Sequence, residues 1–337
     1  MISASTSVSI LMPSYNSALY LRAAIESALG QTWPNKEIIV VDDGSTDRSL
    51  SIAREFESRG VTVISQRNRG QSAAANRALK SAHGDYIKFF DADDLIHPEL
   101  IAKQMARLEN SDTAIASAEW GRFYNDELKT FQLSPERVWR DMEPTDWLVE
   151  AWSSARPMMQ CALWLIPHKL IDRAGGWNER LSLINDFEFF TRVLCRAEQV
   201  RFASGAPVYY RSGRLGTLSK ALTRRAVESA LESALLGTGQ LLSIRDDSPA
   251  RRACANLFQD IIYTYYPDHN DLLRKAARRV EELGGSDLPP TGTRPFEQLR
   301  DIFGWKMAKR IQRAAYWVGY KPRPPFPGSL TKDANTA

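Results

Sequence analysis

The stretch Asp85-Tyr86-Ile87-Lys88-Phe89-Phe90-Asp91-Ala92-Asp93-Asp94 joins an apolar run to three carboxylates. Its first six residues have the aromatic and β-branched bias of a buried strand, so the acids are expected where that strand leaves its sheet. Carboxylates this close repel one another and shift each other's pKa unless a hard cation such as Mg²⁺ or Mn²⁺ offsets their charge. The stretch therefore predicts a metal or nucleotide site. The alternative, that Asp93 or Asp94 caps the following helix, leaves Asp91 unexplained.

The chain ahead of this stretch alternates between apolar, strand-like runs and segments with apolar residues at helical spacing. Such alternation predicts a parallel sheet with helices on both faces, whose ligand sites lie at the carboxyl ends of the strands. Polar clusters follow Met12, Val41 and Phe90 directly, so all three are expected at that edge. The strands are predicted at 8–12, 37–41, 61–65 and 85–90, and the helices at 21–29, 50–56 and 72–82.

Composition is that of a soluble globular protein, since 43% of the 337 residues are hydrophobic and 25% are charged. The length permits one large α/β domain with an appendage. Three cysteines, odd in number and far apart, argue against a disulfide framework or a cysteine-based zinc site. We find no signal-sequence pattern in residues 1–7 and no apolar run long enough to span a bilayer, which predicts a cytoplasmic location. A net charge of +4 gives no support to a nucleic-acid partner, and none is predicted.

The pattern changes twice further along the chain. Residues 114–210 have longer loops and many tryptophans, and after residue 219 the sequence is almost continuously compatible with helices. A domain boundary is therefore predicted near residue 220, with a helical region over 221–320. The last residues, 321–337, are rich in proline and then polar, and are expected to be disordered.

Five motifs follow one another along the chain, at Val8–Asn16, Gln31–Pro34, Val40–Asp47, Asn68–Asn76 and Asp91–Asp94. Together with later motifs they resemble the family 2 glycosyltransferases of GT-A fold, in the family's order and over about residues 7–220. The resemblance implies an α/β fold of GT-A type, a Rossmann-like, nucleotide-binding mixed sheet flanked by helices, with a helical C-terminal extension. It also implies that residues 1–112 are the nucleotide-sugar-binding half and residues 113–220 the acceptor-binding half.

On the family pattern, Pro13, Tyr15 and Asp43 look like the nucleobase pocket. Tyr15 has a ring that can stack on a base, and Asp43 can accept a hydrogen bond from a uracil-like N–H. The other polar residues that follow the second strand are predicted to serve turns and helix capping instead. These are Asp42, Ser45 and Asp47.

The resemblance also implies a role for each acidic residue of the predicted site. Asp91 is expected to face the ribose or the metal, and Asp93 to coordinate the Mn²⁺ or Mg²⁺ that bridges both phosphates, with Asp94 in support. Asp186 stands where the family has its general base, although Asn185 replaces the acid that usually precedes it. From the residues alone, an alternative is that Asn185 caps a helix whose positive end Asp186 favours.

Residues 209–219 look like the family's closing loop, with Arg214 near the position where histidine is usual. A guanidinium cannot bind a cation but can clamp a diphosphate, so Arg211 or Arg214 is predicted to neutralise phosphate charge. The alternative is two solvated arginines. Ala75 is a further departure, since the family often has arginine there.

The resemblance implies an inverting, metal-dependent transfer of a sugar from a nucleoside-diphosphate sugar, with UDP-sugar favoured, to a hydroxyl of a glycan or lipid-linked acceptor in envelope or polysaccharide synthesis. A non-catalytic nucleotide-sugar binder is an alternative, made plausible by Ala75, Asn185 and Arg214. Nucleotidyl transfer is disfavoured because residues 13–16 replace the expected glycine- and lysine-rich loop. Four residues are candidates for contacts with the donor or acceptor sugar, because aromatic faces stack on sugar rings. The alternative for the tryptophans is ordinary packing in the core. The candidates are Trp120, Trp164, Trp177 and Glu179.

The segment 303–318 has an unusual distribution of residue types around a helix. A narrow apolar stripe is flanked on one side by basic residues and tryptophans, which suits a helix lying at a membrane surface. The alternative is that the stripe packs on the preceding helices while the basic side is solvated. The stripe comprises Phe303, Met307, Ile311, Ala314 and Val318; its flank comprises Trp305, Lys306, Lys309, Arg310, Arg313 and Trp317.

Overall fold

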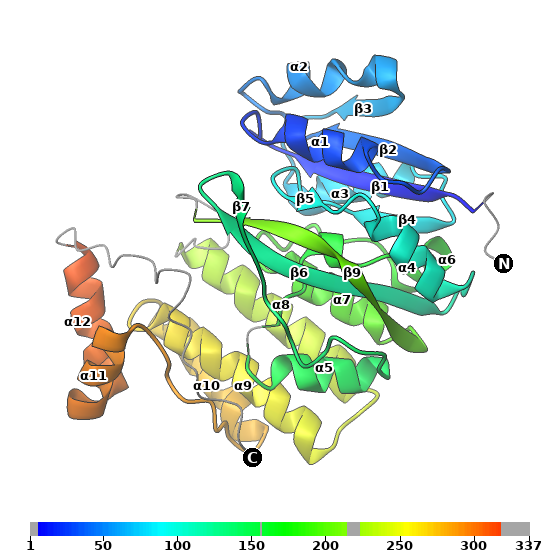
Figure 1. Cartoon of the computed structure of the whole chain (residues 1–337). Helices are drawn as coiled ribbons and strands as arrows, with labels where there is room; N and C mark the ends of the chain where they lie inside the picture. The colour runs from blue at the N-terminus through cyan, green and yellow to red at the C-terminus, as the bar shows by residue number, and fades with distance from the viewer. Residues whose placement is uncertain (1–5, 156, 214–222, 318–337) are drawn as a thin grey trace.

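The computed structural model describes residues 6–155, 157–213 and 223–317. Its first half is built on a five-stranded sheet with the order β3-β2-β1-β4-β8, seen at the top of Figure 1. β1 to β4 run parallel and β8 is antiparallel to β4. The four predicted parallel strands are thus confirmed. Their bounds are Val8–Ser14 (β1), Lys36–Asp42 (β2), Val61–Ser65 (β3) and Tyr86–Phe89 (β4), with Ile166–Pro167 as β8.

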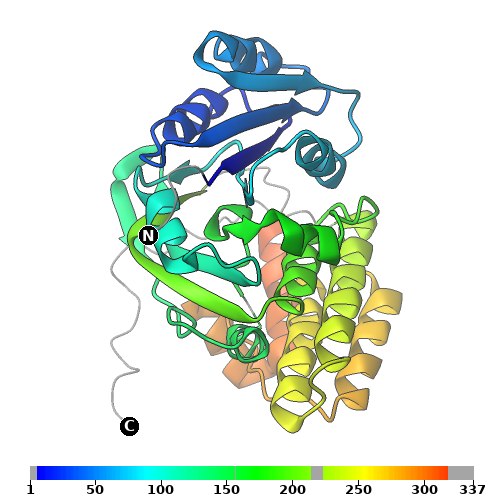
Figure 2. The same ribbon diagram turned by 90° about the vertical axis from the view of Figure 1, so that its right-hand side faces the viewer.

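Helices cover both faces of this sheet, as the alternating pattern predicts. Figure 2 shows α1 and α3 on opposite sides of the strands. Apolar positions at helical spacing explain the packing, because α1 buries Leu21, Ala24, Ile25 and Ala28 along one side. The helices of this half are α1 (Leu21–Leu29), α2 (Ser49–Arg54), α3 (Gln71–Lys80) and α4 (Leu100–Leu108), with a short 3₁₀ turn at Glu57–Arg59.

A second sheet with the order β5-β9-β6-β7 lies beneath the first in Figure 1. Its short strand β5 begins directly after the three acids and pairs with β9, so Leu95 lies opposite Tyr209. This pairing places residue 211, which follows Tyr209 in β9, close to the acids. The strands are β5 (Leu95–Ile96), β6 (Ala114–Tyr124), β7 (Glu127–Leu133) and β9 (Gln199–Ser212). The helical segments are α5 (Pro144–Trp152), a 3₁₀ turn η2 (Cys161–Leu163), α6 (His168–Ala174) and α7 (Asn185–Leu194).

The C-terminal region is helical, as predicted. Asp247 caps α9 by accepting a hydrogen bond from the backbone N–H of Ala250 at 2.9 Å. α8 packs directly on α7, where a Cβ on Gly237 would come within 2.4 Å of the Phe187 ring. The division of the chain near residue 220 stays a prediction, and the tail at 321–337 lies outside the described residues. The helices are α8 (Arg224–Leu242), α9 (Ser248–Tyr265), α10 (Asn270–Glu282), α11 (Arg294–Phe303) and α12 (Trp305–Trp317).

None of the helices in the described ranges combines the length and the apolar character that a membrane crossing requires.

Lys88 is a charged side chain in the middle of the core, with no exposed surface. Its Nζ donates hydrogen bonds to Gln104 Oε1 at 2.9 Å, to Ala162 O at 2.7 Å and to Trp164 O at 3.3 Å. Burial lowers the pKa of this ammonium to about 7. The lysine therefore ties β4, just ahead of the acids, to the η2 segment of the second half.

Replacing Lys88 with methionine is expected to lower the free energy of unfolding by about 2–5 kcal/mol, because buried acceptors that lose their donor cost about 1–3 kcal/mol each. Urea unfolding followed by circular dichroism measures this loss. Lys80→Met, at an exposed position on α3, is the matched control and is expected to change stability by no more than about 0.5 kcal/mol. Equal effects of the two substitutions would contradict the role of the buried ammonium.

Candidate active site

The polar segments after β1, β2 and β4 meet at one edge of the first sheet. β1 lies between β2 and β4, and all three strands run in the same direction. Residues that follow their carboxyl ends are therefore neighbours, which confirms the predicted edge. Tyr15, Asp43 and Asp91 are the candidate residues that follow the three strands.

Asp43 organises the corner of the site predicted to bind a nucleobase. Only 2% of this residue is exposed. One carboxylate oxygen accepts hydrogen bonds from Gln66 Nε2 at 2.7 Å and Arg69 N at 2.9 Å, and the other accepts from Gly70 N at 2.8 Å. Beside this loop, Tyr15 is half exposed. The geometry therefore offers an accessible aromatic surface next to a rigid loop, with partly buried Pro13 in the same segment.

The residues predicted to serve the turn after β2 do so. Asp42 Oδ2 accepts a hydrogen bond from Ser45 N at 3.2 Å. Asp47 Oδ1 accepts from Ser49 N at 2.9 Å, where α2 begins. These contacts are ordinary turn and helix-start chemistry, so the assignment of Asp42, Ser45 and Asp47 to structure is confirmed.

Four carboxylates form the centre of the site. Asp94 is 1% exposed, while Asp91, Asp93 and Asp186 are each partly exposed. Enclosure by the protein, together with the charges of Asp93 and Asp186, raises the pKa of Asp91 to about 7. Enclosure also raises the pKa of Asp186 to about 6. Gln71 Nε2 donates to Asp91 Oδ1 at 3.1 Å, and the adjacent Ser72 accepts from Asn185 at 3.0 Å, so the two acidic motifs, which are far apart in the sequence, share one site.

Asp186 lies in the first turn of α7. Its carboxylate accepts a hydrogen bond from Phe187 N at 2.8 Å. Asn185 is the first residue of α7 and not its N-cap, which is Ile184. Its Oδ1 accepts from the adjacent Asp186 N at 3.2 Å, and its Nδ2 donates to Ser72 Oγ on α3 at 3.0 Å and joins the two helices. The capping interpretation of Asn185 is therefore wrong. The next acid, Glu188, is held by Arg192 at 2.7 Å, so Asp186 is the carboxylate of this turn that faces the acid cluster.

Cys161 is a site residue that the sequence analysis missed. Its thiol lies near Asp91 and helps to stabilise the charged form of that carboxylate. Burial, followed by the charges of Asp91, Asp186 and Asp94, raises the pKa of the thiol well above its usual value. The thiol therefore stays protonated beside the acids. A lone cysteine in an irregular segment gives no sequence signal, because its position depends on Lys88 holding η2 against β4.

Arg211 braces the acidic loop. Its Nε donates to Asp93 O at 2.6 Å, its backbone N–H donates to Asp94 Oδ1 at 2.8 Å, and its guanidinium pairs with Asp126. The guanidinium carbon lies 4.6 Å from the Phe123 ring, and 5% of the side chain is exposed. A direct contact of Arg211 with diphosphate stays a prediction, since this structure shows the guanidinium engaged within the protein. Arg214, the second predicted clamp, lies outside the described residues.

The carboxylates fit a divalent cation only in part. Among the described residues, we find no group of three or more acidic, histidine or cysteine side chains arranged to hold a metal ion. Asp91 and Asp93 are hard oxygen ligands, and Mg²⁺ or Mn²⁺ is commonly held by one or two carboxylates together with substrate phosphates and water. The residues present therefore fit a cation that binds together with a diphosphate.

Asp91→Asn is expected to melt at a higher temperature than the unchanged chain at pH 8 without divalent cations. The pKa of Asp91 is about 7 in the folded chain and 3.8 ordinarily, so ionisation through this range lowers the free energy of unfolding. The gain should be about 2–4 °C for each kcal/mol of repulsion relieved, and most of it should be lost toward pH 4, where the folded carboxyl is protonated and the unfolded one is only partly ionised. Thermal melts at both pH values test this. Asp172→Asn, at an exposed position on α6, is the control, and a gain independent of pH would contradict the explanation.

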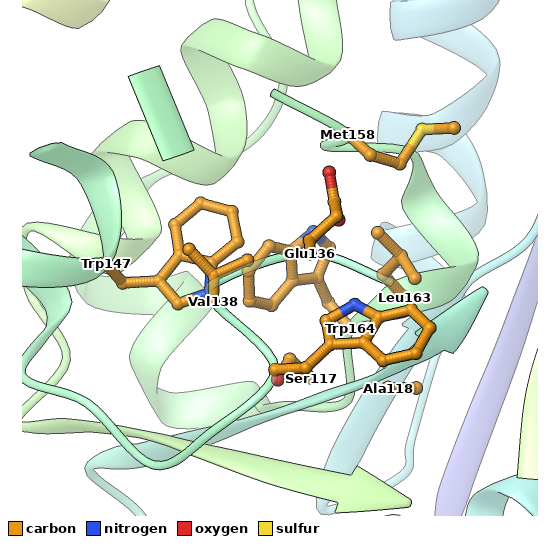
Figure 3. A pocket seen from close by; sticks show the side chains of 9 residues that line it. Ser117, Ala118, Glu136, Val138, Trp147, Met158, Leu163 and Trp164 are labelled. Atoms are coloured by element: carbon orange, nitrogen blue, oxygen red, sulfur yellow. The ribbon is translucent and has the colours of Figure 1, made fainter. Parts of the chain in front are cut away.

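The tryptophans considered as sugar contacts are core residues. Trp120, Trp164 and Trp177 are 6%, 0% and 5% exposed, and Trp177 stacks on Phe189 with ring centroids 4.2 Å apart. Figure 3 shows the small cavity beside Trp164. Its volume of about 10 Å³ has room for one water molecule and not for a sugar. The packing alternative is therefore confirmed for these three residues. The fourth candidate, Glu179, accepts hydrogen bonds from the side chains of Arg69 and Asn76, and its contact with a sugar stays a prediction.

Comparisons with known proteins agree with this arrangement. The model of Glycosyl transferase family 2 matches residues 9–171, which include the cluster Asp91–Asp94 and end before Asp186. An uncharacterized glycosyltransferase, YibD of Escherichia coli (strain K12), is 34% identical over 163 residues, 46% of this chain and 47% of that protein. The chain spans about half the length of the curated relatives it matches.

Two solved structures share the fold. S. aureus TarS 1-349 in complex with UDP has a TM-score of 0.66 at 17% identity, covering 94% of this chain and 93% of that one. The mannosyltransferase PcManGT from Pyrobaculum calidifontis, in complex with GDP-Man and Mn²⁺, has a TM-score of 0.52 at 16% identity, covering 93% and 88%. Sequence and fold agree: residues 9–171 match the glycosyltransferase 2 family, and the chain has the GT-A fold of these two structures.

Proposed function

We propose that the chain is an inverting, metal-dependent glycosyltransferase that moves a sugar from a nucleoside-diphosphate sugar, with UDP-sugar favoured, to an acceptor hydroxyl. The observation that carries the proposal is the grouping of Asp91, Asp93 and Asp186 in one partly exposed site. The match of residues 9–171 to the family supports the reaction class. The structural neighbours bound to UDP, and to GDP-Man with Mn²⁺, support a nucleotide-sugar donor and a divalent cation.

On the donor side, Tyr15 and Asp43 receive the nucleobase at the ends of β1 and β2. Asp93, with Asp91, would hold a cation that offsets the negative charge of the departing diphosphate. Arg211 keeps these ligands in place through its bonds to the backbone of Asp93 and the carboxylate of Asp94. Donor binding therefore depends on residues from the first sheet and on one brace from the second.

On the acceptor side, Asp186 takes the proton of the acceptor hydroxyl as its oxygen bonds to the anomeric carbon. The bond between that carbon and the diphosphate oxygen breaks on the opposite face, so the configuration inverts in one step. A base of pKa about 6 is ionised at neutral pH and still basic enough to accept a proton late in the reaction. Residues 1–112 would bind the donor and residues 113–220 the acceptor.

The physiological setting is part of the same proposal. It comprises a glycan or lipid-linked acceptor in envelope or polysaccharide synthesis, with the nucleotide-sugar met at the cytoplasmic side. A relative from Borreliella burgdorferi, named cholesterol galactosyltransferase and 26% identical over 77% of this chain, supports a lipid acceptor. The alternative is a non-catalytic nucleotide-sugar binder. The observation in its favour is that Arg211 is engaged within the protein and not presented to a ligand.

A donor-hydrolysis screen tests the proposal. The chain is incubated with UDP-, GDP- and dTDP-sugars in Mn²⁺, and release of nucleoside diphosphate is measured against Asp186→Asn. We expect slow release from one donor class that depends on both Asp186 and the cation. Tight binding of a donor without release in any condition, acceptors included, would favour the non-catalytic alternative.

A further inference from the structure

An exposed apolar surface lies on the last two described helices. Of the eleven large hydrophobic residues that are exposed in the described chain, four fall within ten positions. They are Ile302, Phe303, Met307 and Ile311, with exposed fractions of 71%, 60%, 46% and 38%. We call these four residues the apolar edge. Figure 1 shows α11 and α12 at the outside of the molecule, beyond α9 and α10.

The opposite face of α12 explains why this edge points outward. Trp305 packs edge-on against Tyr263 and Tyr266, with ring centroids 4.9 Å and 5.1 Å apart, and Ala308 is fully buried. Met307 and Ile311 are one turn apart on the other side of the helix. The apolar stripe recognised in the sequence therefore does not pack on the preceding helices, and that alternative is wrong for the described residues.

The charges beside the apolar edge have one sign. α12 carries four basic residues and no acidic one. Arg313 pairs with Asp268 at 3.0 Å. Lys306 and Arg310 are exposed and one turn apart, each next to Met307 or Ile311 in the sequence, and their charged groups lie 5.8 Å from the Trp305 ring and 5.7 Å from the Tyr266 ring. The only acid next to the apolar edge in sequence, Asp301, is paired with Arg300 at 2.8 Å.

We propose that the apolar edge, with Lys306 and Arg310, is a docking surface for an anionic lipid membrane. Exposed apolar side chains beside a row of cations are what an interfacial helix uses to insert shallowly and to attract lipid headgroups. A second copy of the chain is a poorer occupant, because edge-to-edge pairing would bring the cations of both copies together without an acidic partner on α12. The proposal does not depend on the catalytic assignment.

Vesicle sedimentation tests the docking surface with the full chain. Vesicles of phosphatidylcholine with one quarter phosphatidylglycerol are compared with vesicles of phosphatidylcholine alone, at 0.1 M and 0.5 M salt. We expect the chain to pellet with anionic vesicles at low salt and to be released at high salt. The double variant Met307→Glu/Ile311→Glu should lower the partition coefficient at least tenfold. Lys306→Gln/Arg310→Gln should lower it by roughly fivefold for each charge.

Matched controls keep the result interpretable. Ile244→Glu places a charge at a hydrophobic residue that is 55% exposed elsewhere, and Arg274→Gln/Arg278→Gln removes two exposed cations one turn apart on α10. Both should bind vesicles like the unchanged chain, and thermal melts verify that every variant folds. No pelleting with anionic vesicles, or equal binding by the edge variants and their controls, would overturn the proposal. So would an oligomer in light scattering that the edge variants dissociate while vesicles are not bound, because the occupant would then be a second copy.

Discussion

Asp186→Asn is expected to slow sugar transfer by a factor on the order of 10² to 10⁴ while the donor still binds, because a positioned general base contributes an acceleration of that size. The amide keeps the size of the side chain and can still accept the hydrogen bond from Phe187 N. It cannot take a proton from the acceptor. Steady-state transfer rates and calorimetric donor affinity, measured on the same preparation, separate chemistry from binding.

The rate should also depend on pH in a defined direction. Since burial raises the pKa of Asp186 to about 6, the base is protonated and inactive below that pH, and transfer should rise with pH through about 6. Glu188→Gln is the matched control on the same helix, because its amide oxygen can still accept from Arg192 Nε. Near-normal transfer by Asp186→Asn, or an equal loss in Glu188→Gln, would remove Asp186 from the role of base.

Asp93→Ala is expected to abolish the part of donor affinity that depends on the divalent cation. Removing one of two carboxylate ligands leaves the cation to Asp91, and the diphosphate charge is then poorly offset. Titration of the chain with UDP, with and without Mn²⁺, measures the cation-dependent increment directly. The increment should vanish in the variant, while the weak affinity seen without cation should persist through Tyr15 and Asp43.

The backbone contact of Asp93 offers an internal control for this result. Arg211 Nε bonds to the carbonyl oxygen of Asp93 and not to its carboxylate, so the substitution leaves that brace in place. Unchanged cation-dependent affinity in Asp93→Ala would contradict the metal assignment. Loss of the cation-independent affinity as well would indicate that the loop itself had collapsed.

Much of the first half could be predicted from the sequence, because its signals are local. An apolar run such as 37–41 or 85–90 identifies a strand without reference to any distant residue, and the turn chemistry of Asp42 and Asp47 acts over two or three positions. Parallel strands with intervening helices also place Tyr15, Asp43 and Asp91 at one edge. The nucleotide corner and the acidic cluster followed from that rule and from the motifs.

Other parts of the site depend on contacts between residues far apart in the chain. The bond from Arg211 N to Asp94 spans 117 positions and exists because β5 pairs with β9. The strand pattern of two residues, Leu95 and Ile96, is too short to predict that pairing. The local pattern therefore predicts Arg211 only as a cation near phosphate, while the fold makes it a brace for the acidic loop.

Burial decided the remaining differences between expectation and structure. Lys88 resembles any lysine in a strand, yet the packing of η2 against β4 gives its ammonium buried acceptors and no exposed surface. Helical periodicity places Met307 and Ile311 on one face of α12, but periodicity cannot say whether that face meets protein or solvent. The sequence determined the elements and the residues available for chemistry. Which side chains were buried, paired or exposed was decided by the tertiary structure, because those properties are set by neighbours that local patterns do not specify.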